Sequence, residues 1–152
     1  MPDFILELRE RIGHQLLWLP GVTAVVLEGE NVLLVRRSDN GEWAPVTGIV
    51  DPGEHPVRAA EREVLEETGV VCRVEALAWV NVSEEIVHAN GDHAQYLDHT
   101  FRCRFVRGVP HVADDESLEV RWFPLQALPA MESILRERIV VAAEHEGPVR
   151  LQ

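Results

Sequence analysis

The sequence contains little of what would indicate a disulfide-stapled, zinc-binding or membrane-spanning protein. Its only two cysteines, Cys72 and Cys103, stand in apolar, strand-like surroundings and in no CxxC or Cys/His spacing typical of zinc. We therefore expect two buried thiols rather than a disulfide. No apolar run approaches the roughly 20 residues that span a bilayer, and charged residues interrupt the N-terminus, unlike a signal peptide. These absences favour a cytoplasmic protein.

Basic residues are also scarce. Lysines and arginines number 14 against 26 acidic residues, which gives a formal net charge of −12. Binding to duplex nucleic acid requires basic side chains against phosphates, so a duplex is not expected as a partner. A polyphosphate substrate would also be repelled unless bound cations bridge it to carboxylates. An anionic substrate would thus make a metal necessary.

The chain shows no repeats, low-complexity segments or linkers, so we expect one domain over residues 1–152. Within residues 1–19, apolar side chains recur at intervals of four from Phe4 to Leu16. This spacing predicts an amphipathic helix over residues 3–17 that Leu19-Pro20-Gly21 ends. Such an N-terminal helix would pack on its own domain or contribute to a homodimer.

Several β-branched, apolar runs predict strands around one further helix. The first two runs form a hairpin, residues 83–95 read as an exposed loop, and residues 131–145 carry apolar side chains at helical spacing. The expected strands are 22–27, 32–35, 46–50, 70–82, 96–106 and the segment that ends at Pro124.

One stretch organises the rest, and it runs from Gly48 to Val70. Asp51-Pro52-Gly53-Glu54 suits a type II turn, because proline presets φ and glycine tolerates a positive φ. A helix should follow from about His55 and stop at Gly69. Strand, turn and short acidic helix therefore form one unit.

The charges of that helix indicate a metal site. Glu63, Glu66 and Glu67 are spaced i, i+3 and i+4, so their carboxylates gather on one face and repel one another. A hard divalent cation would relieve the repulsion, since Mg²⁺ and its relatives prefer carboxylate oxygens. Considered alone, the helix is better explained as a solvated acidic face, which is the usual explanation of a run of charges.

The whole stretch resembles the Nudix box. Gly48, then Glu54 after five residues, then Arg62-Glu63-Val64-Leu65-Glu66-Glu67-Thr68-Gly69-Val70 after seven more fill every fixed position. The resemblance implies an α/β/α sandwich with a mixed central sheet and, in this chain, an extra N-terminal helix. It also implies an enzyme that uses Mg²⁺ or Mn²⁺ to hydrolyse a nucleoside diphosphate linked to another group.

The resemblance assigns roles within the box. Glu63, Glu66 and Glu67 would supply metal oxygens, and the Gly48 carbonyl would add one more. Arg62 would orient the carboxylates, because a guanidinium is always charged and cannot coordinate a metal.

Other acidic residues have supporting roles. Glu54 would support the geometry of the loop and the helix without itself binding the metal. Glu116 would add a further carboxylate to the metal site, because many Nudix hydrolases use an acidic residue on a loop before a strand such as this one. Asp115 and Glu119 are the next candidates after Glu116 for this role. The alternative is that the whole loop is solvated and takes no part in the site. The general base would be Glu67 or Glu116.

Substrate contacts are expected around the box, where strand ends meet the catalytic loop. Of Arg36 and Arg37, one would bind a phosphate while the other pairs with an acidic neighbour; the alternative is a solvated strand edge. Trp43 would stack on a base or cap the core. Asn90 and Asp92 are further specificity candidates, whereas His88, His93 and His99 match no metal-ligand spacing. The expected contacts are Arg36, Arg37, Trp43 and Tyr96.

The box does not discriminate a nucleoside triphosphate from ADP-ribose or another nucleotide sugar. Neither a proline nor a tyrosine occurs at residues 84–86, where some subclasses carry marker residues, so ADP-ribose gains no support. A different alternative is a non-catalytic Nudix domain that senses a nucleotide and regulates a partner. The complete set Glu63, Glu66 and Glu67 argues against a pure sensor.

Overall fold

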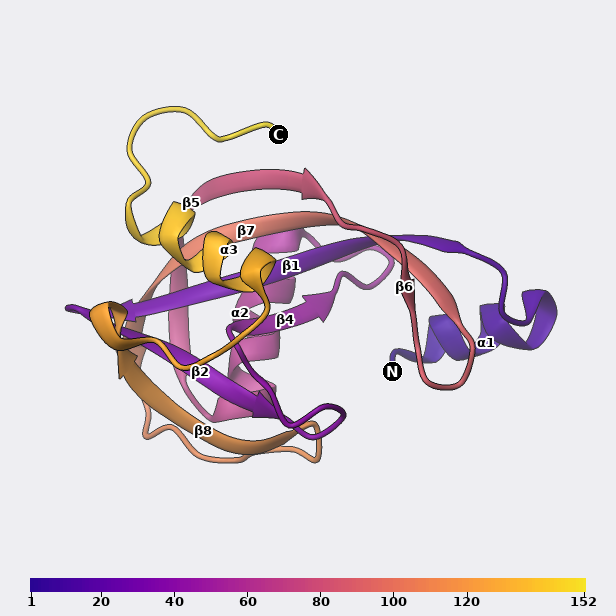
Figure 1. Cartoon of the computed structure of the whole chain (residues 1–152), viewed down its shortest axis with the longest axis horizontal. Coiled ribbons are helices and arrows are strands. Elements are labelled where there is room, and N and C mark those ends of the chain that lie inside the picture. The colour runs from indigo at the N-terminus through magenta and orange to yellow at the C-terminus, as the bar shows by residue number, and fades with distance from the viewer.

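One mixed sheet of eight strands carries the helices of the chain. The computed structural model describes residues 1–152, and Figure 1 shows their arrangement. The elements are α1 (Asp3–Ile12), β1 (Leu17–Glu28), β2 (Asn31–Arg37), β3 (Trp43–Ala44), β4 (Val46–Ile49), α2 (Pro56–Thr68), β5 (Val71–Val82), β6 (Ile86–Val87), β7 (His93–Arg107), β8 (Ser117–Pro124), the 3-10 helix η1 (Leu125–Ala127) and α3 (Ser133–Ala143).

Strand β1 lies at the centre of the sheet. On one edge it pairs in parallel with β7, from Leu17 opposite Ala94 to Leu27 opposite Arg104. On its other edge it pairs antiparallel with β4 over residues 21–24 and with the start of β2. Strand β5 covers the outer edge of β7, and β3 and β8 both pair with β2. The mixed sheet is therefore confirmed.

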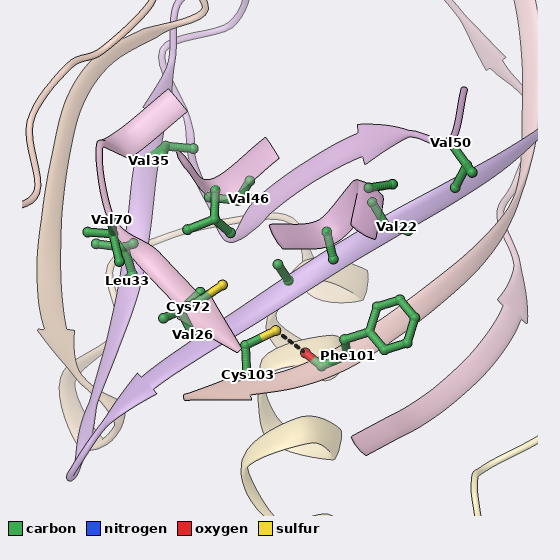
Figure 2. Packing of buried hydrophobic residues seen from close by; sticks show 14 residues of the cluster. Val22, Val26, Leu33, Val35, Val46, Val50, Val70, Cys72, Phe101 and Cys103 are labelled. Atoms are coloured by element: carbon green, nitrogen blue, oxygen red, sulfur yellow. Dashed lines mark hydrogen bonds between the residues drawn. The ribbon is translucent and has the colours of Figure 1, made fainter. Parts of the chain in front are cut away.

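Two hydrophobic clusters lie on opposite faces of this sheet. Val22, Ala24 and Val26 of β1 belong to the first cluster, which includes residues of α2 (Figures 1 and 2). Val25 points the other way, into a second cluster that includes Ile139 of α3. Because strand side chains alternate between faces, β1 contributes to both clusters. Helices on both faces confirm the α/β/α sandwich.

The two cysteines lie in the first cluster, as Figure 2 shows. Both are free and buried, and the thiol of Cys103 approaches the carbonyl of Phe101 at 3.8 Å. The prediction of buried thiols is confirmed.

The turn and helix of the box form as predicted. Glu54 N–H donates to the Asp51 carbonyl at 3.0 Å, and Gly53 has a φ of +81°. Helix α2 begins with Pro56, where a missing N–H costs nothing. It ends at Gly69, whose N–H donates to the Leu65 carbonyl and whose φ of +73° turns the chain out of the helix.

The N-terminal helix is shorter than predicted. It ends at Ile12, and β1 then runs straight through Leu19-Pro20-Gly21, so the expected break there is wrong. The Pro20 carbonyl accepts from Val50 N–H at 3.0 Å. A residue's N–H and C=O point to the same side of a strand, so the missing proline donor faces a position just beyond β4. No neighbouring strand needs that donor.

The predicted exposed loop over residues 83–95 contains a hairpin instead. Strand β6 pairs with His93 and Ala94 of β7, so β7 begins earlier than the predicted Tyr96. The tip is a turn at Asn90 and Gly91, in which His88 N–H donates to the Asp92 carbonyl. Two-residue strands are too short for their periodicity to be read from sequence.

Helix α1 lies beside this hairpin rather than over the sheet (Figure 1). Arg9 Nη2 donates to the His93 carbonyl at 2.7 Å, and His14 Nδ1 hydrogen-bonds to Asp92 Oδ1 at 2.7 Å. Only Ile5 of the helix is buried. The alternative that α1 contributes to a homodimer stays a prediction. No helix in the chain is long and apolar enough to cross a bilayer.

Candidate active site

Helix α2 brings the three box glutamates to three different environments. Glu67 is 5% exposed, the Glu63 side chain is 14% exposed, and that of Glu66 is 54% exposed. Their helical spacing keeps them on adjacent positions of one face. Exposure to solvent therefore increases along the predicted face, from the buried carboxylate of Glu67 to the solvated one of Glu66.

The backbone at Gly48, on β4, lies directly against Glu63. A Cβ atom at Gly48 would stand 2.4 Å from Glu63 Cγ and 2.5 Å from Cδ, closer than real contacts allow. The φ of Gly48 is not positive, so a glycine is needed here for space rather than for conformation. The close approach places the Gly48 backbone beside the carboxylate of Glu63. The resemblance assigns both groups to the same metal site.

A second acidic segment approaches from the loop before β8. Carboxylate oxygens of Glu67, Asp114 and Glu116 all lie within 4.8 Å of one another. The loop is tied to the end of α2, because Ala113 N–H donates to the Glu67 carbonyl at 3.2 Å. The sequence-predicted Glu116 therefore lies beside Glu67.

Asp114 was not among the sequence candidates, whereas Asp115 and Glu119 were. Asp114 Oδ1 accepts from the Glu116 N–H at 3.0 Å, which folds the loop so that the two residues share one side. Glu119 instead pairs with Arg36. The run of acidic residues was visible in the sequence, but the turn that selects Asp114 was not.

Burial and mutual repulsion hold protons on two of these carboxyl groups. Burial, with Glu63, Glu116 and Asp114 nearby, raises the pKa of Glu67 to about 9. Burial also raises the pKa of Glu63 to about 7, although the Arg62 guanidinium opposes the shift. Such shifts mark groups whose negative charge lacks compensation.

Arg62 connects the turn, the helix and the carboxylates. Its Nη1 donates to Glu63 Oε1 at 2.9 Å and to Glu66 Oε2 at 3.2 Å. Its Nε and Nη2 donate to the two oxygens of Glu54 at 2.7 and 2.9 Å. Nη2 also reaches the Ile49 carbonyl at 3.3 Å. One guanidinium therefore fixes groups from three segments of the box.

Glu54 is fixed in turn by the backbone of the loop. Its Oε1 accepts from Asp51 N–H at 3.1 Å, and the Arg62 hydrogen bonds lower its pKa below the ordinary value. This carboxylate therefore stays charged at neutral pH. Its contacts are those of a residue that positions others.

The donor set suits a hard divalent cation. Every side chain of the group around Glu67 offers carboxylate oxygen, with no sulfur or imidazole among them, and Mg²⁺ and Mn²⁺ prefer such ligands. The raised pKa of buried Glu67 reports the same lack of positive charge. A divalent cation would supply that charge.

A pocket of about 830 Å³ opens beside Gly48. Its walls come from β1, β4, β7, the β6 hairpin, the start of α3 and the loop after β2. The residues that line it include Gly21, Arg37, Gly48, Tyr96, Asp98 and Arg138.

The sequence-predicted substrate contacts divide into two groups. Arg37 and Tyr96 line the pocket, and Arg37 is also held by Asp39 through two hydrogen bonds of 3.0 and 2.7 Å. Arg36 and Trp43 lie outside it. Arg36 pairs with Glu119, and Trp43 packs edge-on against Phe123, which makes it a cap on the second cluster.

The residues of the β6–β7 hairpin do not gather into a metal site. His88 lines the pocket, His93 bonds to Glu85, and His99 bonds to the Gly21 carbonyl. Asp92 anchors α1 and does not line the pocket, so its candidacy as a substrate contact is not supported.

Sequence reasoning missed one buried polar group at the pocket wall. Asp98 of β7 and Arg138 of α3 are 4% and 7% exposed, and both line the pocket. A signal did exist for the arginine, because Arg138 falls on the apolar face of its helix with Leu135, Ile139 and Ala142. A charged residue in such a stripe is rarely buried without a partner.

Comparisons with known proteins agree with this geometry. The family described as "NUDIX domain" matches residues 18–142. A MutT-like protein of Streptomyces ambofaciens is 32% identical over 127 residues, which cover 82% of this chain and 75% of that protein. The 8-oxo-dGDP phosphatase NUDT18 of Mus musculus is 33% identical over 135 residues, 84% of this chain.

The chain spans only 37% of the length of the mouse protein. Among solved structures, a UDP-X diphosphatase superimposes with a TM-score of 0.72 and 24% identity, covering 99% of this chain and 74% of that one. At this identity the likeness concerns the fold alone.

Proposed function

Because this chain belongs to the Nudix family of hydrolases, we propose that it is a metal-dependent pyrophosphohydrolase. It cleaves a nucleoside diphosphate linked to another group, by attack of water on phosphorus. The observation that carries the proposal is the convergence of Glu63, Glu67 and Glu116 with the Gly48 backbone beside the pocket. A nucleoside diphosphate also appears in the name of one relative, the phosphatase that acts on 8-oxo-dGDP.

The residues that would hold Mg²⁺ or Mn²⁺ are the Gly48 carbonyl, Glu63, Glu66 and Glu67. A bound divalent cation lowers the pKa of water and offsets the negative charge of the diphosphate. The uneven burial of the three glutamates suits a ligand that faces solvent on one side. Glu66 would contact the metal ion from the solvent side, and Glu67 from the buried side.

Arg62 keeps these carboxylates in place through its hydrogen bonds to Glu63 and Glu66. Glu54 holds the other edge of the guanidinium, and so transmits the shape of the turn to the site. Both residues act by positioning and do not touch the reacting atoms.

The general base is Glu67 or Glu116. With a pKa of about 9, Glu67 retains its proton at neutral pH until positive charge is supplied nearby. Glu116 is accessible to solvent, with 55% of its side chain exposed, and lies close enough to act on the same water. Single Gln variants of each residue, compared for kcat at fixed metal concentration, distinguish them.

Arg37 is the phosphate contact and Tyr96 a surface for the base or sugar. Arg37 is a cation in the pocket wall near an otherwise acidic site, so it can meet substrate phosphate without a bridging metal. Tyr96 offers an apolar ring face.

The test is release of phosphate or nucleoside monophosphate from a panel of substrates with Mg²⁺ or Mn²⁺. The panel contains nucleoside di- and triphosphates, ADP-ribose, nucleotide sugars and dinucleoside polyphosphates. Glu67→Gln serves as the blank, and Glu119→Gln, an exposed carboxylate outside the acidic group, serves as the matched control. We expect turnover that depends on metal, falls at least ~10²-fold in Glu67→Gln and persists in Glu119→Gln.

The alternative is a non-catalytic domain that senses a nucleotide. No turnover on any substrate, together with measurable nucleotide binding, would establish that reading. Turnover that survives Glu67→Gln would instead refute the assignment of the site while leaving the activity intact.

A further inference from the structure

A buried pair of opposite charges forms part of the pocket wall. Arg138 Nε lies 3.5 Å from Asp98 Oδ2. The Thr23 hydroxyl donates to Asp98 at 3.1 Å and accepts from Arg138 Nη1 at 3.2 Å. The Thr100 hydroxyl donates to Asp98 Oδ2 at 3.1 Å. Three elements, β1, β7 and α3, therefore meet at one carboxylate.

This group is not saturated by the protein. Arg138 Nε is buried and has no hydrogen-bond acceptor. Asp98 Oδ1 accepts only from Thr23, and it shares that bond with Oδ2. A carboxylate has about four acceptor positions over its two oxygens. The Asp98 carboxylate thus keeps unused acceptor capacity beside the Arg138 guanidinium, and both residues line the pocket.

Gly21 keeps the approach to Asp98 Oδ1 open. A Cβ at Gly21 would stand 3.4 Å from Oδ1 and 3.5 Å from Tyr96 Cδ1. The φ of Gly21 is not positive, so a side chain is excluded by no backbone strain. A side chain at this position of the pocket wall would lie against the carboxylate and cover part of it.

A purely structural role, that of tying α3 to the sheet, explains these observations less well. A buried ion pair contributes little net stability, because desolvation offsets its attraction, and apolar residues would hold the helix as well. Such a tie has no reason to line a cavity or to leave Nε without an acceptor.

The pair suits an uncharged partner rather than a phosphate. Asp98 and Arg138 carry opposite charges, and the carboxylate would repel a phosphate oxygen. A carboxylate acceptor beside a guanidinium donor complements a ring N–H next to a carbonyl. Both resulting hydrogen bonds are charge-assisted and stronger than bonds between neutral groups.

We propose that Thr23, Asp98, Thr100 and Arg138 form the subsite that reads the nucleobase, and that it selects bases with a ring N–H beside a carbonyl. The inference rests on the proposed function, since it assigns a substrate class to the same pocket. Hypoxanthine and guanine present this edge, whereas adenine presents an amino group beside an unprotonated ring nitrogen.

The decisive comparison is between inosine and adenosine diphosphates, which differ only at this edge. Their affinities are measured by isothermal titration with Mg²⁺ on the Glu67→Gln variant, so that hydrolysis does not interfere. We expect inosine and guanosine diphosphates to bind at least ~10-fold more tightly than adenosine diphosphate, because a site built to bond a group rejects analogues that lack it.

Two added substitutions test the residues. Asp98→Asn removes the negative charge of the carboxylate while preserving its shape, and Gly21→Ala adds a methyl group against Asp98 Oδ1 while leaving both charged residues in place. Each is expected to reduce the inosine-to-adenosine ratio to within about threefold. The matched control is Asp92→Asn, another buried carboxylate bonded to its neighbours but outside the pocket; it should leave the ratio unchanged.

Equal affinity for the two diphosphates in the parent would overturn the inference. So would an unchanged ratio in a folded Asp98→Asn protein, or, if that variant does not fold, in Gly21→Ala. A preference set by an attached sugar and indifferent to the base would also overturn it and assign the wall to sugar hydroxyls. Failure of the proposed function has a different signature, which is base-selective binding without turnover by the unsubstituted enzyme.

Discussion

Arg62 and Glu54 face each other edge to edge, with Nε donating to Oε2 at 2.7 Å and Nη2 to Oε1 at 2.9 Å. This two-point contact fixes the plane of the guanidinium, whose remaining donors then hold Glu63 and Glu66. A lysine could supply the charge but not the fork. A lysine at position 62 would therefore show whether the site needs the geometry of the guanidinium as well as its positive charge.

Arg62→Lys is expected to reduce kcat and apparent metal affinity by about 10- to 100-fold, the usual cost of disturbing residues behind metal ligands. Arg58→Lys on the same helix is the control, because Arg58 makes one exposed contact with Glu61 at 3.3 Å. Metal titrations of turnover, with circular dichroism as a check on folding, measure both. Equal losses in the two variants would contradict the role given to Arg62.

Gly48→Ala should damage the site through crowding. The added methyl would overlap Glu63 Cγ, and overpacking costs about 1–3 kcal/mol of unfolding free energy. Turnover should fall at least ~10-fold as Glu63 is displaced. Combining it with Glu63→Ala should restore the stability lost in Gly48→Ala but not the activity. Denaturant unfolding and kinetics test this, and an active, fully stable Gly48→Ala protein would refute the close approach.

Divalent cations should stabilise the protein through Glu67. A metal concentration about 100 times the dissociation constant adds about 2.7 kcal/mol to the free energy of unfolding. For a domain of this size the gain corresponds to several degrees in Tm. Glu67→Gln should be at least as stable as the parent in EDTA, since it removes a buried, repelled carboxyl group. Its gain on adding Mg²⁺ or Mn²⁺ should be smaller. Identical metal-induced shifts in both proteins would exclude Glu67 as a ligand.

The anchor of α1 should weaken in acid. The hydrogen bond with His14 holds the pKa of Asp92 below its ordinary value, opposed by burial and supported by Asn90. A lowered native pKa stabilises the fold above the unfolded value of 3.8, and that stability is lost as pH falls further. Between about pH 5 and about pH 2.5, Tm should therefore fall less in Asp92→Asn than in the parent. Asp3→Asn, at the exposed start of α1, should keep the parental slope.

Local patterns sufficed for the box. Glycine, proline and charge spacing fixed the turn at Gly53, the ends of α2 and the shared face of its glutamates, because these depend on neighbours in sequence. The acidic loop before β8 was also recognisable. Which of its residues faces Glu67 depends on a turn at Asp114 and on backbone contacts to α2, which no spacing rule encodes.

Long-range pairing decided the rest. Pro20 signals a break, but its carbonyl bonds to Val50 and its missing donor faces no strand, so β1 continues through it. Trp43 was ambiguous between base and core until Phe123 was placed against it. Arg138 falls on the apolar face of its helix, and no local pattern pairs it with Asp98, which lies on a distant strand.

Because β1 sends alternate side chains to opposite faces, Val22 packs with residues of α2 while Thr23 turns toward α3. Substitutions around Thr23 can therefore accumulate without repacking the face that carries the box glutamates. A scaffold of this kind is free to diverge in what it accepts while its reaction stays constant. Substrate range would then be the fast-evolving trait of such a protein, and bond cleavage the slow one.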